Sequence, residues 1–451
     1  MLDEQQARQL CDQIFKRCGS DPAEVFLYAV DESLTRFANN TIHQNVAERN
    51  LTLHLRLQRG KRLGMASTNR REGEALDKLV SQARANADAN PENPEHLGFS
   101  EATSTLPVDA FDRETSAFTP DQRAHPVGIV CRLAHENGLN ASGAFMTGVN
   151  SIAIANTLGL FVYHSGTVAD FSTVVMSEDS SGWAHASDWK VGELQPEALG
   201  QEAIWKAERG RHPREVKPEV YQVIFDPYVT EDLLNTLNWH GMGGQTVLEG
   251  RSWMSKRLGQ QAFSPNISIY DDGRDVSGLP MPFDGEGIPK HRVDIVQNGV
   301  IKTPLYDRKS AKKAGVQTTG HALPPILPTY LQSIGPIGVN LFMAVGEASL
   351  DEMIRTTDRG LYITRFWYTR LVHPSDCVVT GMTRDGVFMI EKGELAYPVK
   401  NLRFTQSYVE ALAGVEAVGK ESRLLMIEVG NRAVRVPALK LTGFNFTGAT
   451  V

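Results

Sequence analysis

The sequence has few cysteines, no excess of positive charge and no long hydrophobic run. Its four cysteines are scattered and form no C-x-x-C pair, a pattern typical of a reducing cytosol rather than of a disulfide-stapled secreted domain. The formal net charge is −7, which does not favour a nucleic-acid or anionic-membrane partner. No apolar run approaches the roughly 18 residues of a membrane-spanning helix. The N-terminus lacks the basic and then apolar order of a secretory signal, so we expect a cytoplasmic protein.

The pattern along the 451 residues predicts an α+β protein of three domains. We expect an N-terminal α+β domain over residues 1–100, a central mixed domain over 101–214 and a β-rich C-terminal domain with antiparallel sheets over 215–451. Strands are expected at 24–31, 34–44 and 51–58, the last because leucines alternate there with polar residues. Apolar spacing predicts helices at 3–18, 74–87, 119–136, 196–209, 231–239, 309–314 and 349–356.

A helical stretch in the third domain carries the first candidate site, Asn235-Thr236-Leu237-Asn238-Trp239-His240. A zinc peptidase helix needs two histidines on one face and a nearby glutamate, which handles the proton of the metal-bound water. Here the corresponding polar positions are Asn235, Thr236 and His240, and only His240 is a good zinc ligand. From the residues alone, a histidine that simply caps the end of a helix explains the segment as well.

An acidic stretch forms the second candidate site. Asp271 and Asp272 precede one glycine, and Asp284 and Glu286 flank another. The spacing is not that of a calcium loop. Two interpretations stay open: the acids cap turns, or they line a groove that receives peptide amides or a positive peptide end.

The alternating segment 378–407 is the third candidate surface. Asp385-Gly386 and Lys392-Gly393 predict hairpin turns there. Such a meander either offers an edge to an extended peptide or is a plain antiparallel sheet. The sequence contains neither a G-x-S-x-G nucleophile elbow nor a phosphate-binding G-x-x-x-x-G-K-[ST] loop.

Several stretches together resemble the TldD/PmbA family, also called the TldD/TldE or "modulator of DNA gyrase" family. They occur in the family's order between residues 34 and 407. The matching segments are LTRFANNTIHQN, GKRLGMAST, AIANTLGLFVYHSGT, SSGW, EVYQVIFDP, GRSWMSKRLG, ISIYDDG, FDGEGIPKHRVDIVQNGVIKTPLYDRKSAKKAG and MIEKGELAYPVKNLRFTQS.

The resemblance implies two branches that work as a pair. The TldD-like branch carries H-E-x-x-x-H and a later cysteine as zinc ligands, whereas the TldE/PmbA-like branch lacks this motif. Anchored on GRSWMSKRLG, Asn235 takes the place of the first histidine, Thr236 that of the glutamate and His240 that of the second histidine. Val418, ahead of Gly-Lys-Glu, takes the place of the cysteine. The resemblance therefore implies no zinc in this chain, zinc in a partner subunit, and a degenerate metallopeptidase domain.

The leading hypothesis is a non-catalytic TldE/PmbA-like subunit. Its expected partner is a TldD-like zinc metallopeptidase subunit, and its expected substrate is a flexible peptide that the pair degrades or trims. Isolated, the chain would form a homodimer or stay alone. Two alternatives stay open: a regulatory or binding protein that needs no TldD-like partner, and a self-sufficient hydrolase rebuilt around His240 and nearby acids.

Overall fold

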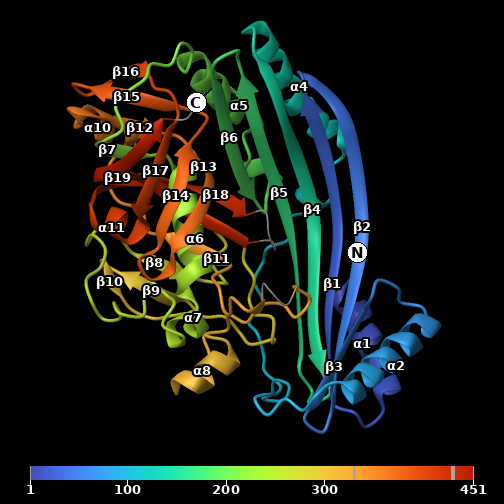
Figure 1. The fold of residues 1–451 in the computed structure, drawn as a ribbon. Coiled ribbons are helices and arrows are strands. Elements are labelled where there is room, and N and C mark those ends of the chain that lie inside the picture. The colour runs from blue at the N-terminus through green and yellow to red at the C-terminus, as the bar shows by residue number, and fades with distance from the viewer. Residues whose placement is uncertain (1, 329–331, 428–431, 450–451) are drawn as a thin grey trace.

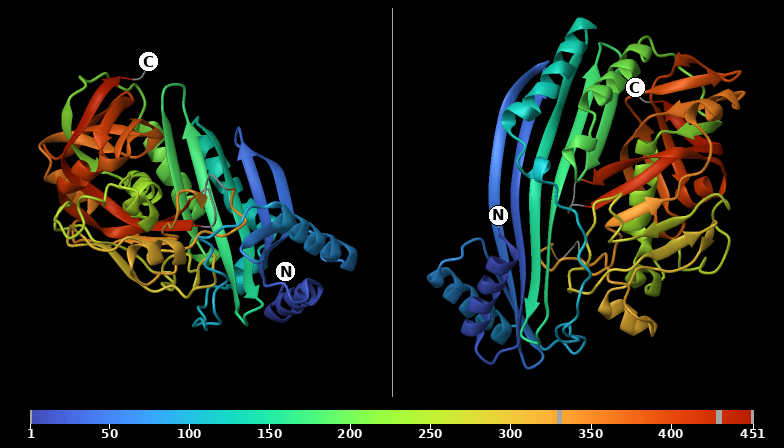
Figure 2. Two further views of the ribbon diagram at one scale, coloured as in Figure 1. Left: turned by 60° about the horizontal axis from the view of Figure 1, so that its bottom comes forward. Right: turned by 180° about the vertical axis from the view of Figure 1, so that it is seen from behind.

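The computed structural model describes residues 2–328, 332–427 and 432–449. Two parts lie side by side: a tall antiparallel sheet built by the N-terminal half, and a C-terminal unit of shorter strands (Figures 1 and 2). The α+β class predicted from the sequence is confirmed. No helix in the described ranges is both long and apolar enough to cross a lipid bilayer.

The tall sheet contains six strands in the order β3-β2-β1-β4-β5-β6. Their bounds are β1 Ala23–Ala38, β2 Thr41–Arg59, β3 Arg62–Thr68, β4 Asn140–Asn156, β5 Phe161–Met176 and β6 Ser181–Asp188. Strand β1 pairs with β4 from Glu24 to Phe37, so the first two predicted domains contribute three strands each to one sheet. The extra strand predicted at 34–44 is wrong. Asn39 and Asn40 have φ of 52° and 57°, the geometry of a two-residue hairpin turn, so β1 continues to this turn and β2 begins after it.

Helices cover one face of this sheet at its two ends. Helices α1 (Glu4–Cys18) and α2 (Gly73–Ala89) cover the lower end, and α4 (Pro120–Glu136) and α5 (Pro196–Arg209) cover the upper end (Figure 1). A short helix, α3 (Arg113–Ser116), and a 3₁₀ turn, η1 (Val191–Glu193), lie between them in the chain. Since side chains alternate along a strand, the opposite face is left for the C-terminal unit.

Apolar side chains on that opposite face pack against the C-terminal unit. Phe26, Ile154 and Val162 form one cluster with Phe283, which comes from a loop of the C-terminal unit. Both faces of the long sheet are thus buried where the two parts meet, and the hydrophobic contact fixes how they sit against each other.

The C-terminal unit is a branched, mixed sheet. Its main path runs β10-β9-β8-β11-β19-β7-β12-β15-β16, and a branch runs from β19 through β17 and β14 to β13. Strand pairs β11–β19 and β7–β12 are parallel, whereas the sequence predicts antiparallel pairing throughout. The strands are β7 Val220–Phe225, β8 Ile269–Asp271, β9 Val293–Gln297, β10 Val300–Ile301, β11 Asn340–Met343, β12 Arg359–Ile363, β13 Phe366–His373, β14 Val378–Thr383, β15 Val387–Glu391, β16 Glu394–Pro398, β17 Leu402–Ser407, β18 Val415–Ile427 and β19 Arg432–Ala449.

The two turns predicted in segment 378–407 behave differently. Lys392-Gly393 joins β15 and β16 as a hairpin. Asp385-Gly386 is a turn, but β14 pairs with β13 and β17 while β15 pairs with β12 and β16, so it joins different branches. The Asp385 carboxylate accepts hydrogen bonds from Arg365 Nη1 at 2.8 Å and Ser181 Oγ at 2.7 Å. These bonds hold the turn that connects the two branches of the sheet.

The helices of the C-terminal unit are short. They are α6 Pro227–Leu237, the π turn η2 Asn238–Met242, α7 Gly244–Leu248, α8 Arg308–Ala314, α10 Leu350–Arg355, the 3₁₀ turn η3 Pro374–Asp376 and α11 Tyr408–Ala413. The helix predicted at 231–239 begins earlier, because Asp226 caps it and Pro227 occupies its first turn. It ends earlier as well, because the π turn interrupts it.

A partly buried ionic network joins the two parts of the molecule. Glu202 on α5 accepts hydrogen bonds from Arg423 Nη2 on β18 at 2.9 Å and from Lys206 Nζ at 2.7 Å. The Tyr228 hydroxyl on α6 donates to the same carboxylate at 3.1 Å. Burial raises the pKa of Glu202, but Lys206 and Arg423 outweigh it and hold the pKa below its usual value.

Replacing Arg423 with methionine is expected to lower the free energy of unfolding by about 1–3 kcal/mol, because it leaves part of this partly buried network unsatisfied. Urea unfolding followed by circular dichroism measures the change. The matched control is Lys400→Met, which breaks an exposed pair with Glu215 and is expected to cost less than about 1 kcal/mol. Equal costs for the two variants would contradict a stabilising role for the network.

Candidate functional site

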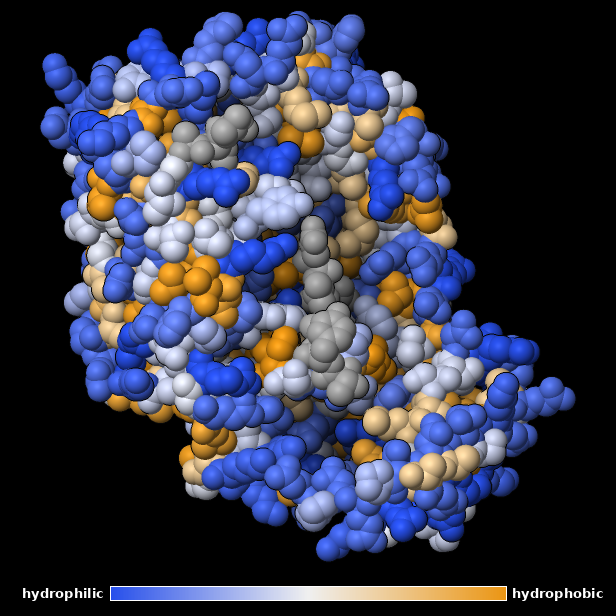
Figure 3. Space-filling view, viewed as in Figure 1, coloured by the Kyte–Doolittle hydropathy of each residue, from blue (hydrophilic) through white to orange (hydrophobic). Residues whose placement is uncertain are grey.

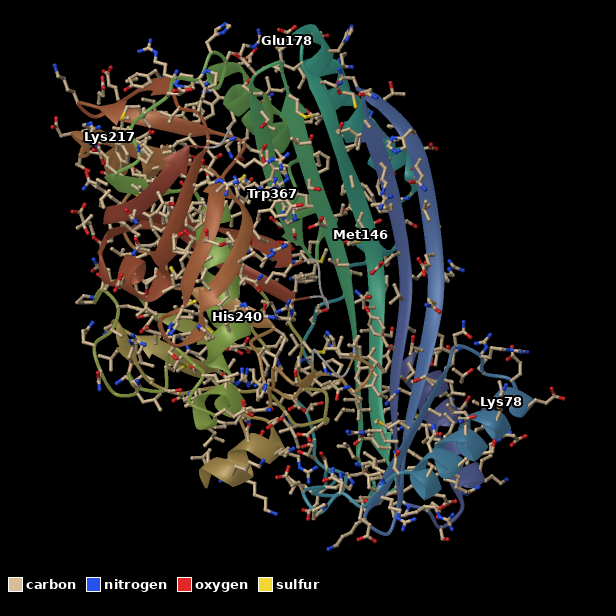
Figure 4. The ribbon with its side chains drawn as sticks, viewed as in Figure 1. Lys78, Met146, Glu178, Lys217, His240 and Trp367 are labelled. Carbon is tan, nitrogen blue, oxygen red and sulfur yellow. The ribbon has the colours of Figure 1, made fainter. Side chains whose placement is uncertain are left out.

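A cavity of about 620 Å³ lies in the C-terminal unit, on the side next to the long sheet. Helix α6, its π turn, the edge strand β13 and the end of β18 form most of the wall, and β6 closes one side. Figure 4 labels two wall residues, His240 in the π turn η2 and Trp367 on β13. The described lining residues are Trp183, His185, Tyr228, Glu231, Asp232, Asn235, Thr236, Trp239, His240, Arg365, Phe366, Trp367, Tyr368, Thr369, Arg370, Leu425, Met426, Ile427 and Arg432.

The π turn η2 brings the last turn of α6 to the cavity wall. Leu237 O accepts a hydrogen bond from Trp253 Nε1 at 2.9 Å, and Asn238 exchanges two hydrogen bonds with the backbone of Gly338, at 2.8 and 2.9 Å. Gly241 leaves room for the Trp253 ring, since a Cβ there would lie 2.1 Å from its Cδ1. Single π turns within helices occur frequently at functional sites.

Three of the four predicted zinc-helix positions come together here. Asn235, Thr236 and His240 all line the cavity. Burial lowers the pKa of His240, and the side-chain oxygen of Asn235 is buried without a hydrogen-bond partner in the described structure. Val418 lies elsewhere: it is 4% exposed on β18, pairs with Leu439 of β19 and packs in the hydrophobic core.

The donor set does not fit a zinc ion. Structural and catalytic zinc sites use three or four Cys, His or carboxylate ligands, and the zinc-helix positions offer one imidazole. Asp232 also lines the cavity, but it accepts hydrogen bonds from the hydroxyls of Tyr408 at 2.7 Å and Thr369 at 2.8 Å. Within the described residues, no group of three or more His, Cys, Asp or Glu side chains is arranged to hold a metal ion.

Aromatic and cationic side chains dominate the rest of the wall, and the sequence reasoning missed them. Arg365 Cζ lies 3.9 Å from the ring centre of Trp183 and 4.8 Å from that of Trp367. Arg432 Cζ lies 4.8 Å from the ring centre of Trp239. Such stacking holds both guanidinium groups in place. The run RFWYTR at 365–370 was the available signal.

Tyr368 stands out at the rim of this wall. It is 64% exposed and has φ of 54°, in a region where β13 loses register with β14. A bulky residue in the left-handed region is strained, and such strain concentrates at binding and catalytic sites. Tyr368 is also one of the residues that line the cavity.

A serine, a histidine and an aspartate also meet beside the cavity. His185 Nε2 lies 2.7 Å from Asp170 Oδ2, and the Ser187 hydroxyl donates to the same carboxylate oxygen at 2.6 Å. In a catalytic triad the imidazole lies between serine and aspartate and uses a different nitrogen for each. Here Asp170 and Ser187 both contact the same nitrogen, His185 Nε2, at 2.7 and 3.3 Å. The cluster therefore does not form a proton relay.

The predicted acidic loop does not line this cavity. Asp271 is fully buried and binds His321 Nε2 at 2.9 Å and the backbone N–H of Val339 at 2.8 Å. Asp284 accepts from three backbone N–H groups, those of residues 286, 288 and 322. Asp272 accepts from the N–H of residue 274. Asp272 and Asp284 thus cap local turns, whereas Asp271 joins segments that are distant in the sequence, and Asp284 also lines a second cavity.

Burial raises the pKa of two acids in this loop, Asp284 and Glu286. Burial, followed by the neighbouring Asp284, raises the pKa of Glu286 to about 8. One of its oxygens accepts a hydrogen bond from the N–H of Arg308 at 3.2 Å. The loop thus carries a carboxyl group that holds a proton near neutral pH.

Models of known families match three consecutive regions of the chain. Residues 23–87 match domain 1 of the PmbA/TldA metallopeptidases, residues 118–211 match their central domain and residues 218–448 match their C-terminal domain. The chain belongs to the PmbA/TldD metallopeptidase family. The resemblance seen in the sequence is therefore confirmed.

Several similar proteins carry metalloprotease names. A metalloprotease of Methanothermobacter thermautotrophicus is 24% identical over 311 residues, which cover 69% of this chain and 67% of that protein. The metalloprotease TldD homolog of Haemophilus influenzae is 25% identical over 47% of this chain and 46% of its own length. For the metalloprotease PmbA of Escherichia coli O157:H7 the identity is 24%, over 67% of this chain and 64% of PmbA. The alignments thus span from under half to about two thirds of these PmbA/TldD relatives.

A solved structure shows the same fold. The crystal structure of TldE from Thermococcus kodakarensis superposes with a TM-score of 0.88 at 20% identity, over 98% of this chain and all of that one. The shared fold includes the long sheet and the C-terminal unit that together position the cavity.

Proposed function

We propose that this chain is the non-catalytic, TldE/PmbA-like subunit of a cytoplasmic heteromeric TldD/TldE-type zinc metallopeptidase, which degrades or trims unfolded peptides, for example by removing a leader from a peptide precursor. The observation that carries the proposal is a cavity at the zinc-helix position whose wall holds Asn235 and Thr236 in place of a ligand and a base. Zinc chemistry then belongs to the partner, and this chain supplies a surface for the peptide.

The character of the cavity supports binding of a peptide. Aromatic rings contact apolar side chains of any sequence, and fixed guanidinium groups donate to main-chain carbonyls or carboxylates. Because Arg365 and Arg432 are stacked on rings, little conformational entropy is lost when they bind. Such a wall suits flexible, varied peptides better than one rigid ligand.

The test compares the purified chain with its complex. Alone, the chain is expected to bind less than one zinc per molecule and to leave an unstructured peptide such as reduced, unfolded casein intact. Co-expressed with a TldD-like chain from the same organism, it is expected to co-purify, and the complex is expected to cleave the peptide. Stoichiometric zinc together with cleavage by the isolated chain would overturn the proposal. A failure to form any stable complex would favour a regulatory protein instead.

His240→Ala in the assembled complex separates a wall role from a catalytic one. A residue that only lines the cavity is expected to change kcat by less than about threefold, whereas loss of a metal ligand or base costs orders of magnitude. The control is an inactivated zinc motif in the TldD-like partner, which must abolish cleavage. A collapse of kcat in His240→Ala with intact assembly would support the self-sufficient hydrolase.

A further inference from the structure

A second, smaller cavity lies where the long sheet meets the C-terminal unit. Its volume is about 330 Å³, within the usual size range of ligand pockets. Figure 3 shows the face of the molecule on which the long sheet and the C-terminal unit adjoin. The wall is mostly apolar, and its described residues are Phe26, Tyr28, Ile152, Trp239, Met281, Phe283, Asp284, Gly285, Lys290, Ala322, Leu323, Pro324, Ile326, Leu327, Ile337, Val339 and Arg432.

The second cavity adjoins the first. Trp239 and Arg432 line both, and the guanidinium group of Arg432 stacks on the indole ring. This stacked pair is a shared wall between the polar, aromatic cavity and the apolar one. The two cavities are therefore neighbours on either side of this pair.

Lys290 is the unusual residue of the apolar cavity. It is 2% exposed, and its Nζ has no hydrogen-bond partner in the described structure. Its position is well defined: its backbone N–H donates to Pro282 O at 2.9 Å, and Gly273 makes room for its stem, since a Cβ there would lie 2.4 Å from Lys290 Cδ. A buried ammonium group without an acceptor is costly, so the group is available to an oxygen that the described residues do not supply.

The charges around Lys290 decide what kind of oxygen fits. Asp271, Asp272 and Asp284 all act electrostatically on its ammonium group. The oxygens of Asp271 and Asp284 already accept hydrogen bonds from backbone N–H groups or His321. These acids therefore balance the lysine charge without satisfying its hydrogen bonds. A further anion would be repelled by them, whereas a neutral carbonyl oxygen would not.

We infer that the apolar cavity is a subsite for an uncharged apolar residue of the peptide, whose main-chain carbonyl oxygen accepts a hydrogen bond from Lys290 Nζ. The inference rests on the proposed peptide-binding function, which it deepens by naming the side-chain class that is selected. The apolar wall accounts for the side chain, and the buried donor accounts for the carbonyl. No covalent step is involved.

The test measures binding of capped pentapeptides to the full-length chain by NMR titration, so that it does not depend on cleavage. The probes are acetyl-Gly-Gly-Leu-Gly-Gly-amide and its counterpart with glutamate in place of leucine. The leucine peptide is expected to bind at least tenfold more tightly. Lys290→Met is expected to weaken it about tenfold or more, since it removes a charge-assisted hydrogen bond. Lys302→Met, on an exposed lysine, is the matched control and is expected to leave binding unchanged.

A second variant keeps the test independent of Lys290. Ile326→Trp fills the apolar cavity without touching the first one, and it is expected to abolish the preference for leucine. Tighter binding of the glutamate peptide, lost in Lys290→Met, would overturn the inference in favour of an anion site. Unchanged leucine binding in both variants would remove the subsite altogether. If the complex with a TldD-like chain cleaves peptides while these results are negative, the inference fails and the proposed function stands.

Discussion

Replacing Trp253 with alanine is expected to lower the free energy of unfolding of the C-terminal unit by about 3–5 kcal/mol, the usual cost of removing a large buried aromatic side chain. Trp253 is fully buried and stacks on Phe263 with ring centres 5.4 Å apart. It also donates its indole N–H to Leu237 O, where the regular part of α6 gives way to the π turn. Urea unfolding followed by far-ultraviolet circular dichroism measures the loss.

The same substitution is expected to weaken the candidate site. Trp253 packs directly against Gly241, the residue after His240, so an empty space there releases the π turn that forms the cavity wall. Peptide binding should fall together with stability. The matched variant is Trp253→Phe, which keeps much of the packing, loses the hydrogen bond and is expected to cost about 1–3 kcal/mol. Equal stability of the parent and Trp253→Ala would show that the ring does not support the turn.

Local signals in the sequence predicted most of the helices but not how the two parts meet. Thr119 and Pro120 cap α4 as their types require, and α4 continues through Pro126. Nothing local indicates that β1 pairs with β4, because the two strands lie more than 100 residues apart in the chain. The local sequence also does not reveal that Phe26 and Phe283 belong to one core, since burial of the second face of a strand depends on what packs there.

The residues of the candidate site that lie close together in the sequence could be predicted. Those that only tertiary contacts bring to the site could not. The order of residues around the zinc-helix position placed Asn235, Thr236 and His240 together, and all three line one cavity. The arginines that stack on Trp183 and Trp239 come from distant strands, and only the folded chain brings them there. Lys290 gave no signal either, because a lysine in a polar loop normally lies in solvent.

Acidification is expected to destabilise the protein through two buried histidines, His54 and His164. Burial lowers the pKa of each from 6.5 to about 4. His54 lies on β2 with its Nδ1 2.8 Å from Ser67 Oγ, and His164 lies on β5, facing the C-terminal unit. Between pH 6.5 and about 4 the unfolded chain binds protons at these sites and the folded chain does not. Stability therefore falls as the pH falls through this window, by on the order of 2 kcal/mol per histidine at pH 5.

Glu286 acts in the opposite direction, so the prediction concerns a difference between variants. Its pKa of about 8 lies above the unfolded value, and its contribution to stability grows as the pH falls from 8 towards 4.5. Glu286 is present in both the parent and His164→Gln, so its contribution drops out of the difference in stability between them. The free-energy difference between the two proteins is expected to shift by on the order of 2 kcal/mol in favour of the variant between pH 7 and pH 5, measured by urea unfolding at each pH. His43→Gln, at an exposed position of β2, is the control. If this stability difference does not change with pH, the imidazole of His164 is hydrated in the folded protein. Water would then also reach the seam between the long sheet and the C-terminal unit.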